Sequence, residues 1–367
     1  MDRSHLSHRK LRIAIAGTGF GEKYAVGLQA NPDVEIVAVF SRRLERAAAM
    51  AEKFAVPIST RNFEDLLKIP YVDAIAIVTP NSTHAEFVQE AIRARKHVIC
   101  DKPLALTGEE AQDLYQLAEA AGVKHVTFVP YRFSPASIAM KTAAAAGQMG
   151  RTVSVTASWG VDMRAEPLRW RFQRKLSGAG VAADLGAHIL DLLTWWAGPI
   201  RRVLGRGKTL VPHRPGEVGG RRRKVDVPDE CWALLEFAGS GVGSVKLSWN
   251  AQRNQTIEIE GDRGKLVYES PSLLQWLEGT GDFNPTAKFM LTPGSSRPTD
   301  LLLQAKDFAR PEDALARMFR DIVAYLKGGE KSDCIATFRE GAQVLRIIDA
   351  LEESDRTGAW VELPNEI

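Results

Sequence analysis

Short apolar strands alternate with helical segments from Leu11 onward, and this alternation restricts the fold more than any other feature. The strand-like runs are LRIAIAG, VEIVAVF, DAIAIVTP, HVICD and VTFVP, and helical patterns at about 21–29, 42–54, 83–95 and 107–121 separate them. Parallel strands need such crossover helices, and strands buried on both faces read as nearly continuous apolar runs. The pattern predicts an α/β domain with a doubly wound parallel sheet over residues 10–131.

Two of these helices have a sequence signature at their start. Thr83 precedes Glu86 by three residues, and Thr107 precedes Glu110 by the same spacing. In a capping box the hydroxyl and the carboxylate each accept a hydrogen bond from a backbone N–H that the helix leaves unpaired. The spacing predicts that helices begin at Thr83 and at Thr107.

The pattern changes after Tyr131. Strand-like runs follow near TVSVTASW, CWALLEFA, GSVKLSW, TIEIEGDRGKLVYE and SLLQWL, separated by turns that contain glycine. Consecutive strands at hairpin spacing indicate a largely antiparallel sheet. We therefore predict a second domain of α+β type over residues 132–367, with late helices at about 314–326 and 338–353 packed on it. Residues 211–224, rich in glycine, proline and arginine, are expected to form a surface loop.

Composition excludes several classes of protein. The 367 residues are 45% apolar and 25% charged, which is typical of a globular chain, and the net charge of +3 is too small for a dedicated nucleic-acid binder. The basic run at residues 221–224 is short and is expected to be solvated. No apolar run approaches the roughly 18 to 20 residues that cross a bilayer, so no membrane partner is expected.

Cysteine usage points to a reducing compartment. Cys100, Cys231 and Cys334 are odd in number, scattered and without CxxC spacing. This pattern indicates neither a disulfide framework nor a metal site, and a cytoplasmic location fits it best.

A glycine-rich turn follows the first strand and leads directly into a helix. Its residues are Gly17, Thr18, Gly19, Phe20 and Gly21. Glycines permit a tight turn and allow a pyrophosphate to approach the N–H groups at the helix start. The turn departs from GxGxxG because Glu22 stands at the third glycine position, but its context predicts dinucleotide binding; the alternative is a βα turn that binds nothing.

The residues after the second strand bear on the choice of dinucleotide. NAD(H) sites place a carboxylate there for the ribose 2′-hydroxyl, whereas NADP(H) sites place cations for the 2′-phosphate. The chain has Ser41, Arg42 and Arg43, with Arg46 one turn later. NADP(H) is therefore the predicted cofactor and NAD(H) the alternative. A reading without phosphate binding also stands, in which Ser41 caps a helix and the arginines lie in solvent.

At this point the chain resembles a known family. The glycine turn, VTPNSTHAEFVQEAIRARKHVICDKPLA, GAGVAADLGAHILDLLTWW, the loop with Arg214-Pro215 and a closing helix before WVEL occur in the order found in the glucose-fructose oxidoreductase / inositol dehydrogenase / MocA family. These proteins are NAD(P)-dependent oxidoreductases of sugars and polyols. The resemblance covers most of the chain.

The family's Glu-Lys-Pro element corresponds here to Asp101-Lys102-Pro103. The resemblance implies that Lys102 is the catalytic lysine beside the nicotinamide and that the peptide bond before Pro103 is cis. Independently, a lysine at the carboxyl end of a parallel strand points to the crevice where open α/β sheets bind ligands. The alternative is an ordinary solvated lysine.

Asp184 and His188 form a second element, with a spacing of four residues on a predicted helix. Helical i,i+4 spacing places the carboxylate and the imidazole on one face, although most such pairs are surface contacts and two ligands do not make a metal site. The resemblance implies that His188 is the acid/base and that Asp184 supports both the substrate and the imidazole.

The resemblance also implies weaker assignments, each of which has packing or helix capping as its alternative. Residues expected near the cofactor are Asp101, Thr79, Pro80, Asn81, His84, Arg132, Trp170 and Arg171. Tyr131 is expected near the substrate, beside Lys102, Asp184 and His188. Apart from the resemblance, we expect side chains of the predicted antiparallel sheet to decide which substrate binds; the candidates are Trp159, Arg164, Trp249 and Asn250.

Together these features predict an enzyme that transfers hydride between a nicotinamide and a carbinol or ketone carbon of a sugar or cyclic polyol. Two alternatives remain: a catalytically silent dinucleotide sensor, and a reductase of a nucleotide-linked keto-sugar or of a dihydrodiol. A sensor needs no proton relay, so Lys102, Asp184 and His188 together argue against it. A homo-oligomer, dimer or tetramer, is expected through the exposed face of the second sheet.

Overall fold

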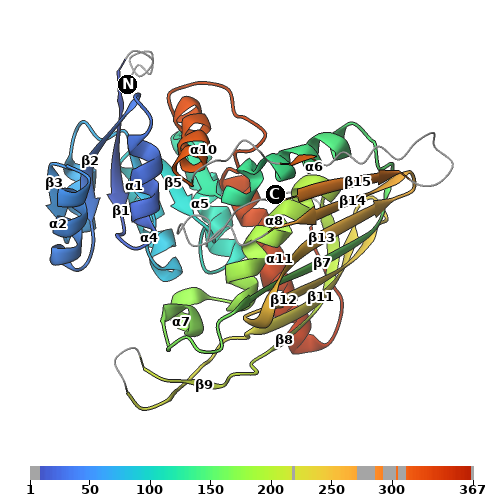
Figure 1. Ribbon diagram of the computed structural model, residues 1–367. Helices are drawn as coiled ribbons and strands as arrows, with labels where there is room; N and C mark the ends of the chain where they lie inside the picture. Colours follow the sequence, from blue (N-terminus) through green and yellow to red (C-terminus); the bar gives the residue numbers. More distant parts are fainter. Residues whose placement is uncertain (1–8, 217–219, 271–285, 292–302, 305–310, 365–367) are drawn as a thin grey trace. The chain divides into compact units, whose positions relative to one another are not determined.

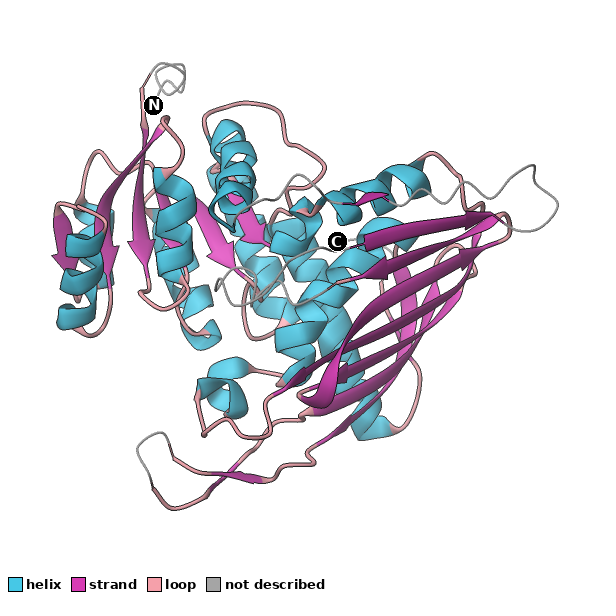
Figure 2. Cartoon of the chain, in the orientation of Figure 1, coloured by secondary structure: helices cyan, strands magenta, loops and turns pink. Residues whose placement is uncertain are grey.

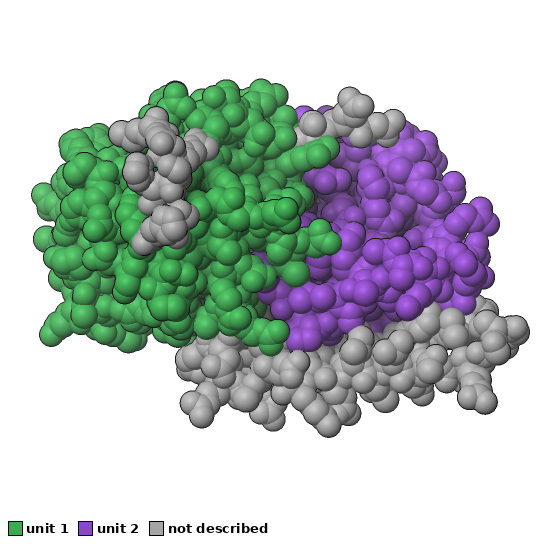
Figure 3. All heavy atoms as spheres, turned by 90° about the horizontal axis from the view of Figure 1, so that it is seen from above, with its two compact units in different colours: residues 1–105, 109–130, 308–342 green, residues 106–108, 131–307, 343–367 purple. Residues whose placement is uncertain are grey.

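The structure is a computed structural model that describes residues 9–216, 220–270, 286–291, 303–304 and 311–364. Its contacts divide the chain into two compact units, which Figure 3 colours separately. The first unit comprises residues 1–105, 109–130 and 308–342, and the second comprises 106–108, 131–307 and 343–367. The units differ from the predicted continuous domains, 10–131 and 132–367, because a late segment joins the first unit.

A six-stranded sheet forms the centre of the first unit (Figure 1). Its strand order is β3-β2-β1-β4-β5-β6, and every neighbouring pair is parallel. The order reverses between β1 and β4, which is the topological switch point of a doubly wound sheet. The strands are β1 (Leu11–Ala16), β2 (Val34–Phe40), β3 (Ile58–Thr60), β4 (Ala74–Ile77), β5 (His97–Asp101) and β6 (His125–Phe128). The predicted Rossmann fold is confirmed.

Helices connect these strands, as the alternating pattern predicts. They are α1 (Gly21–Gln29), α2 (Leu44–Lys53), α3 (Phe63–Lys68), η2 (Asn81–Thr83), α4 (His84–Arg93) and α5 (Gly108–Ala121). The predicted capping role of Thr83 is wrong: its hydroxyl makes no cap hydrogen bond to α4 and instead donates to Pro80 O at 2.9 Å. The short 3₁₀ turn η2 brings that carbonyl within reach, so α4 begins without a hydroxyl cap.

A nine-stranded sheet dominates the second unit (Figure 2). Its order is β16-β15-β14-β13-β7-β12-β11-β8-β17, and all neighbouring pairs are antiparallel except β7 with β12. The strands are β7 (Thr152–Asp162), β8 (Ile200–Lys208), β11 (Glu230–Phe237), β12 (Val242–Ser248), β13 (Asn250–Gly261), β14 (Gly264–Glu269), β15 (Thr286–Leu291), β16 (Leu303–Gln304) and β17 (Val361–Glu362). The predicted α+β class is confirmed; the predicted strand SLLQWL lies outside the described residues.

Helices cover one face of this sheet (Figure 2). In the second unit they are η3 (Pro130–Phe133), α6 (Pro135–Ala145), η4 (Trp170–Phe172), α7 (Arg174–Ser177), the π-helical turn η5 (Ala182–Gly186), α8 (Ala187–Ala197) and most of α11 (Phe338–Thr357). The helical segment 174–197 is long and apolar enough to cross a membrane, although the sequence analysis did not expect such a segment. However, 78% of its apolar stretch is buried inside the protein. Such burial is typical of a core helix.

The late helix α10 (Pro311–Leu326) packs on α1 of the first unit, so its predicted packing on the second domain is wrong. Phe319 of α10 stacks on Phe128 with ring centroids 5.3 Å apart. Gly27 of α1 makes this approach possible, because a Cβ there would lie 2.4 Å from the Phe319 ring. The apolar face of α10 thus completes the core of the first unit.

Residues 211–224 form a hairpin rather than an irregular loop. Its strands are β9 (His213–Arg214) and β10 (Arg223–Lys224). The basic residues 221–224 are exposed, but Arg214 is fully buried. The base of the hairpin is therefore anchored in the second unit.

Candidate active site

The glycine turn has the geometry that a phosphate-binding turn requires. Gly17 has a φ of 116°, and a Cβ at this position would lie 2.3 Å from Val78 O, so only glycine fits. A Cβ at Gly19 would meet no atom within 4 Å. The backbone at Gly19 is therefore open beside the start of α1, where helix N–H groups attract anions.

The arginines after β2 have free guanidinium groups. Arg42, Arg43 and Arg46 are exposed, and none of them forms an ion pair with another described residue. Ser41 does not cap α2, because the N-cap residue of that helix is Arg43 and makes no side-chain cap hydrogen bond. The hydroxyl of Ser41 instead accepts a hydrogen bond from Arg43 N at 3.4 Å. The cluster has the composition to bind a phosphate.

Lys102 follows the carboxyl end of β5, and the bond between Lys102 and Pro103 is cis, as the resemblance implies. Both Asp101 and Lys102 are half-buried. The hydroxyl of Tyr24 on α1 donates to Asp101 Oδ1 at 3.4 Å. The preceding Cys100 is fully buried, and burial raises the pKa of its thiol well above the ordinary value, in keeping with a strand-core residue.

His84 holds the Lys102 loop against the end of β4. Its ring is fully buried, with Nδ1 2.8 Å from Pro103 O and Nε2 2.8 Å from Thr79 O. Burial lowers the pKa of His84, although hydrogen bonding to Pro103 O opposes this effect. A role in cofactor binding stays a prediction for His84 and for its neighbours Pro80, half-buried, and Asn81, buried.

Asp184 lies in the π-helical turn η5, which precedes α8. The predicted uniform helix through Asp184 and His188 is therefore interrupted; single π turns often mark functional sites. The indole N–H of Trp249 donates to Asp184 Oδ2 at 3.1 Å, and Arg171 Nε lies 3.6 Å from Asp184 Oδ1. With 19% of its side chain exposed, the carboxylate keeps access to solvent.

His188 is half-buried on α8. Its ring contacts the Tyr131 ring edge to face, with centroids 4.9 Å apart. Tyr131 in turn contacts Trp159, which is 1% exposed and belongs to the core. The aromatic contacts restrict the imidazole, while a direct substrate contact stays a prediction for Tyr131 and Trp159.

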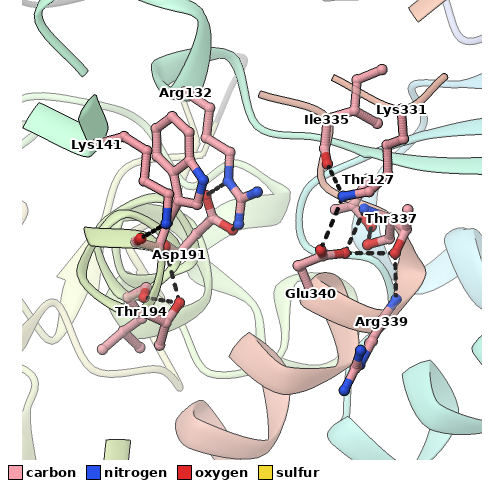
Figure 4. Close-up of polar contacts among 12 residues, drawn as sticks. Thr127, Arg132, Lys141, Asp191, Thr194, Lys331, Ile335, Thr337, Arg339 and Glu340 are labelled. Carbon is pink, nitrogen blue, oxygen red and sulfur yellow. Dashed lines mark hydrogen bonds and ion pairs between the residues drawn. The ribbon is translucent and has the colours of Figure 1, made fainter. Parts of the chain in front are cut away.

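A buried ion pair secures α8 (Figure 4). Arg132 donates from Nε and Nη2 to the two oxygens of Asp191, each at 2.7 Å, and both side chains are 3% exposed. Lys141 Nζ donates to Trp195 O at 2.7 Å near the end of the same helix. The Arg132 guanidinium is therefore engaged within the second unit, and its predicted contact with the cofactor stays a prediction.

The other predicted site residues of the second unit lie in different surroundings. Trp170 is half-buried with Arg171 stacked on its ring, 4.5 Å from the centroid. Arg164 is exposed and pairs with Asp162 at 2.7 Å. Asn250 donates from Nδ2 to the buried Glu230 at 3.0 Å. Their predicted contacts with ligands remain predictions.

The sequence reasoning missed two residues that shape this region, Asp191 and Phe172. Asp191 binds Arg132, and Phe172 packs against Trp249. Asp191 stands three residues after His188 within an apolar helical run. A carboxylate in such a run is expected to be buried and to need a cationic partner, so the sequence did contain a signal for this ion pair. Among the described residues, no group of three or more His, Cys, Asp or Glu is placed to hold a metal ion.

Comparisons with known proteins agree with the fold. Residues 11–128 match the GFO_IDH_MocA model, an oxidoreductase family with an NAD-binding Rossmann fold, and residues 138–267 match the GFO/IDH/MocA C-terminal domain. Levoglucosan dehydrogenase of Pseudarthrobacter phenanthrenivorans is 31% identical over 343 residues, which cover 87% of each chain. D-xylose 1-dehydrogenase (NADP(+)) 2 of Haloferax volcanii is 27% identical, over 96% of this chain and 100% of its own. A solved levoglucosan dehydrogenase in complex with NADH has a TM-score of 0.86 at 27% identity, covering 98% of this chain and 100% of that chain.

Proposed function

Because the chain belongs to the Gfo/Idh/MocA family of NAD-binding oxidoreductases, we propose that it oxidises a carbinol carbon of a sugar or cyclic polyol, or reduces the corresponding ketone, with a nicotinamide as hydride partner. The arrangement around Asp184 carries this proposal. A carboxylate group held by Trp249 and Arg171, on the same helical segment as His188, suits the binding of a hydroxyl group and the transfer of its proton.

Each polar group has a distinct part in this reaction. His188 accepts the hydroxyl proton during oxidation, for which an imidazole is suited near neutral pH. Lys102 donates a hydrogen bond to the same oxygen and stabilises its developing negative charge. Asp184 orients the substrate hydroxyl and the imidazole. The dinucleotide supplies the hydride chemistry, and the protein's task is to position the carbon and to move one proton.

NADP(H) is the proposed cofactor. Gly19 leaves its backbone open to a pyrophosphate. Arg42, Arg43 and Arg46 form no ion pair with a described residue and offer cations where a 2′-phosphate would lie. The relatives differ here, since one is described as NADP(+)-dependent and one was solved with NADH. The arginines favour the phosphorylated dinucleotide.

The remaining proposals concern the cellular location of the enzyme, its oligomeric state and its substrates. The three cysteines are free, which suits a reducing cytoplasm. The open face of the nine-stranded sheet is the proposed site of homo-oligomerisation, which would give a dimer or a tetramer. Sugar or polyol substrates are the proposed small-molecule partners.

A substrate panel tests the proposal. Levoglucosan, D-xylose, other aldoses and inositols are each incubated with NADP⁺ or NAD⁺, and the absorbance of the reduced nicotinamide is followed. His188→Ala and Lys102→Met are expected to lower kcat by about 10²- to 10⁴-fold while the Kd of the dinucleotide stays unchanged. The matched control is His213→Ala, which removes an exposed histidine from β9. Wild-type turnover by His188→Ala would remove that residue from the mechanism.

A further inference from the structure

Arg214 is a buried cation without a carboxylate partner among the described residues. It is 0% exposed, and its Nη1 donates to Met163 O and, at 3.0 Å, to Glu166 O. Within the described part of the chain, its Nε and Nη2 have no hydrogen-bond partner. Burial lowers the pKa of Arg214, and the nearby carboxylates of Asp229 and Glu166 oppose this effect only in part.

A buried charge of this kind is costly to fold. Removing a guanidinium from water is unfavourable unless a carboxylate pairs with it, and Arg214 forms no ion pair with a described residue. Its compensation comes from the two carbonyls and from Phe172, whose ring centroid lies 3.9 Å from Cζ of Arg214. All of these contacts fall within residues 163–172, so Arg214 holds that one segment.

The held segment leads directly to Asp184. Phe172 is fully buried, and its ring meets the Trp249 ring edge to face with centroids 5.2 Å apart. Trp249 donates to Asp184, and Arg171, the neighbour of Phe172, lies beside the other carboxylate oxygen. Both contacts described above for the Asp184 carboxylate therefore depend on groups that adjoin the Arg214–Phe172 stack.

We propose that Arg214 is a positioning residue that fixes the carboxylate of Asp184 through Phe172 and Trp249. The inference rests on the proposed role of Asp184 in substrate binding. A second tie supports it, because Leu168 N donates to Pro215 O at 2.7 Å and joins the hairpin to the same segment. The hairpin thus sets the geometry of the site although Arg214 itself touches no reacting group.

Arg214→Met tests the inference, with Arg222→Met as the matched control. Arg222 lies on the same hairpin and also donates to a backbone carbonyl, His213 O at 2.6 Å, but it is exposed. Arg214→Met is expected to lower kcat/KM for the sugar by about 10- to 100-fold, because small displacements of substrate-positioning groups have large effects on rate. The Kd of the dinucleotide stays unchanged, and Arg222→Met behaves as wild type.

A double-mutant cycle separates positioning from a general structural role. Trp249→Phe removes the indole N–H that Asp184 accepts. If Arg214 acts through Trp249, the losses in kcat/KM of the two variants are not additive, whereas independent structural defects add. Guanidinium added to Arg214→Ala is expected to restore part of the kcat/KM.

Circular dichroism melting verifies that each variant is folded, and Phe172→Leu replaces Arg214→Met if the latter does not fold; the same loss is expected. Wild-type kcat/KM in folded Arg214→Met, or strict additivity with Trp249→Phe, overturns the inference while leaving the proposed function intact. Full activity of Asp184→Asn overturns the inference together with the proposed role of Asp184, since Asp184 would then have no role for Arg214 to support, whereas absence of turnover with every sugar and polyol would count against the proposed function itself.

Discussion

Arginine, rather than a carboxylate, follows the second strand of the nucleotide-binding sheet. Arg42 and Arg43 are exposed and form no ion pair with described residues, so their charge is available to a 2′-phosphate. Charge-assisted contacts of this kind contribute roughly 1.5 to 3 kcal/mol each. We predict that the double variant Arg42→Ala/Arg43→Ala raises the KM of NADP⁺ by about 10- to 100-fold and leaves the KM of NAD⁺ unchanged.

Steady-state kinetics with both dinucleotides measures this effect. Arg93→Ala, which removes an exposed arginine near the end of α4, is the control for a general loss of positive charge. An equal change in the KM of both dinucleotides would show that the arginines do not read the 2′-phosphate.

His125 gives the first unit a pH dependence. Its ring is 2% exposed, Nδ1 accepts from Phe338 N at 3.0 Å, and Nε2 therefore donates to Glu119 at 2.9 Å. Burial lowers the pKa of His125 below the ordinary 6.5, so the folded state keeps the ring neutral while the unfolded chain takes up a proton. Stability is thus full above about pH 6.5 and decreases as the pH falls toward the folded-state pKa.

The corresponding experiment is thermal unfolding between about pH 7.5 and 5.5. We predict that the Tm of the wild type falls as the pH is lowered and that the fall is smaller in His125→Gln. Part of the fall remains, because burial lowers the pKa of His84 in the same direction. His213→Ala, at an exposed position, is expected to leave the profile unchanged; an unaltered profile in His125→Gln would contradict the assignment.

The identity of a single residue was predictable from the sequence where the backbone conformation admits only one residue type. The position of Gly17 in its turn required glycine, and the structure places a close contact there. The partners of Asp184 were not predictable, since Trp249 and Arg171 lie 65 and 13 residues away along the chain. Local patterns identify which face of a helix is buried, but they do not identify the distant side chain that meets it.

A buried ion pair between Arg132 and Asp191 holds the helix α8 in place, and its contribution to stability can be measured. Arg132 and Asp191 are both 3% exposed, so loss of either partner leaves the other as a buried charge that has lost its ion pair. We predict that Asp191→Asn or Arg132→Met lowers the free energy of unfolding by about 3 to 5 kcal/mol, and that the double variant loses less than the sum. Urea denaturation measures it, with the exposed pair Arg151–Asp262 as control. Additive losses would contradict the coupling.

Helices and strands were predicted correctly from the sequence where the spacing of their apolar residues is regular. The five predicted parallel strands read as continuous apolar runs, and all five are present. The sixth parallel strand, β3, was missed because it has only three residues and two of them are polar. Strand β8 was missed because IRRVLGRGK carries three arginines, one lysine and two glycines, which weaken the strand signal. The pattern of α10 revealed its apolar stripe but not its partner, because an apolar stripe does not specify the surface that it packs on. The close approach of Phe319 to α1 depends on Gly27, which lies far away along the chain.

At the scale of the whole molecule, one face of the nine-stranded sheet carries exposed apolar side chains that could join copies of the chain. Trp232, Leu234 and Val242 are 41%, 48% and 54% exposed on the neighbouring strands β11 and β12. They share one face, because Trp232 pairs with Lys246, Leu234 with Ser244 and Glu236 with Val242. Large exposed apolar side chains gathered in this way are typical of interaction sites, whereas single ones are ordinary.

We predict that this face joins two copies of the chain and that Trp232→Glu/Leu234→Lys yields a monomer. Two like sheet surfaces can pair about a twofold axis, and aromatic side chains at the centre of such an interface often contribute a large part of the binding free energy. A buried Glu or Lys without a partner would oppose that association. Light scattering after size-exclusion chromatography gives the mass of each variant, and Leu210→Lys, at a 51% exposed leucine after β8, is the control. The same assembly in the double variant and the wild type would place the interface elsewhere, whereas dissociation of the double variant with unchanged secondary structure would locate it on β11 and β12.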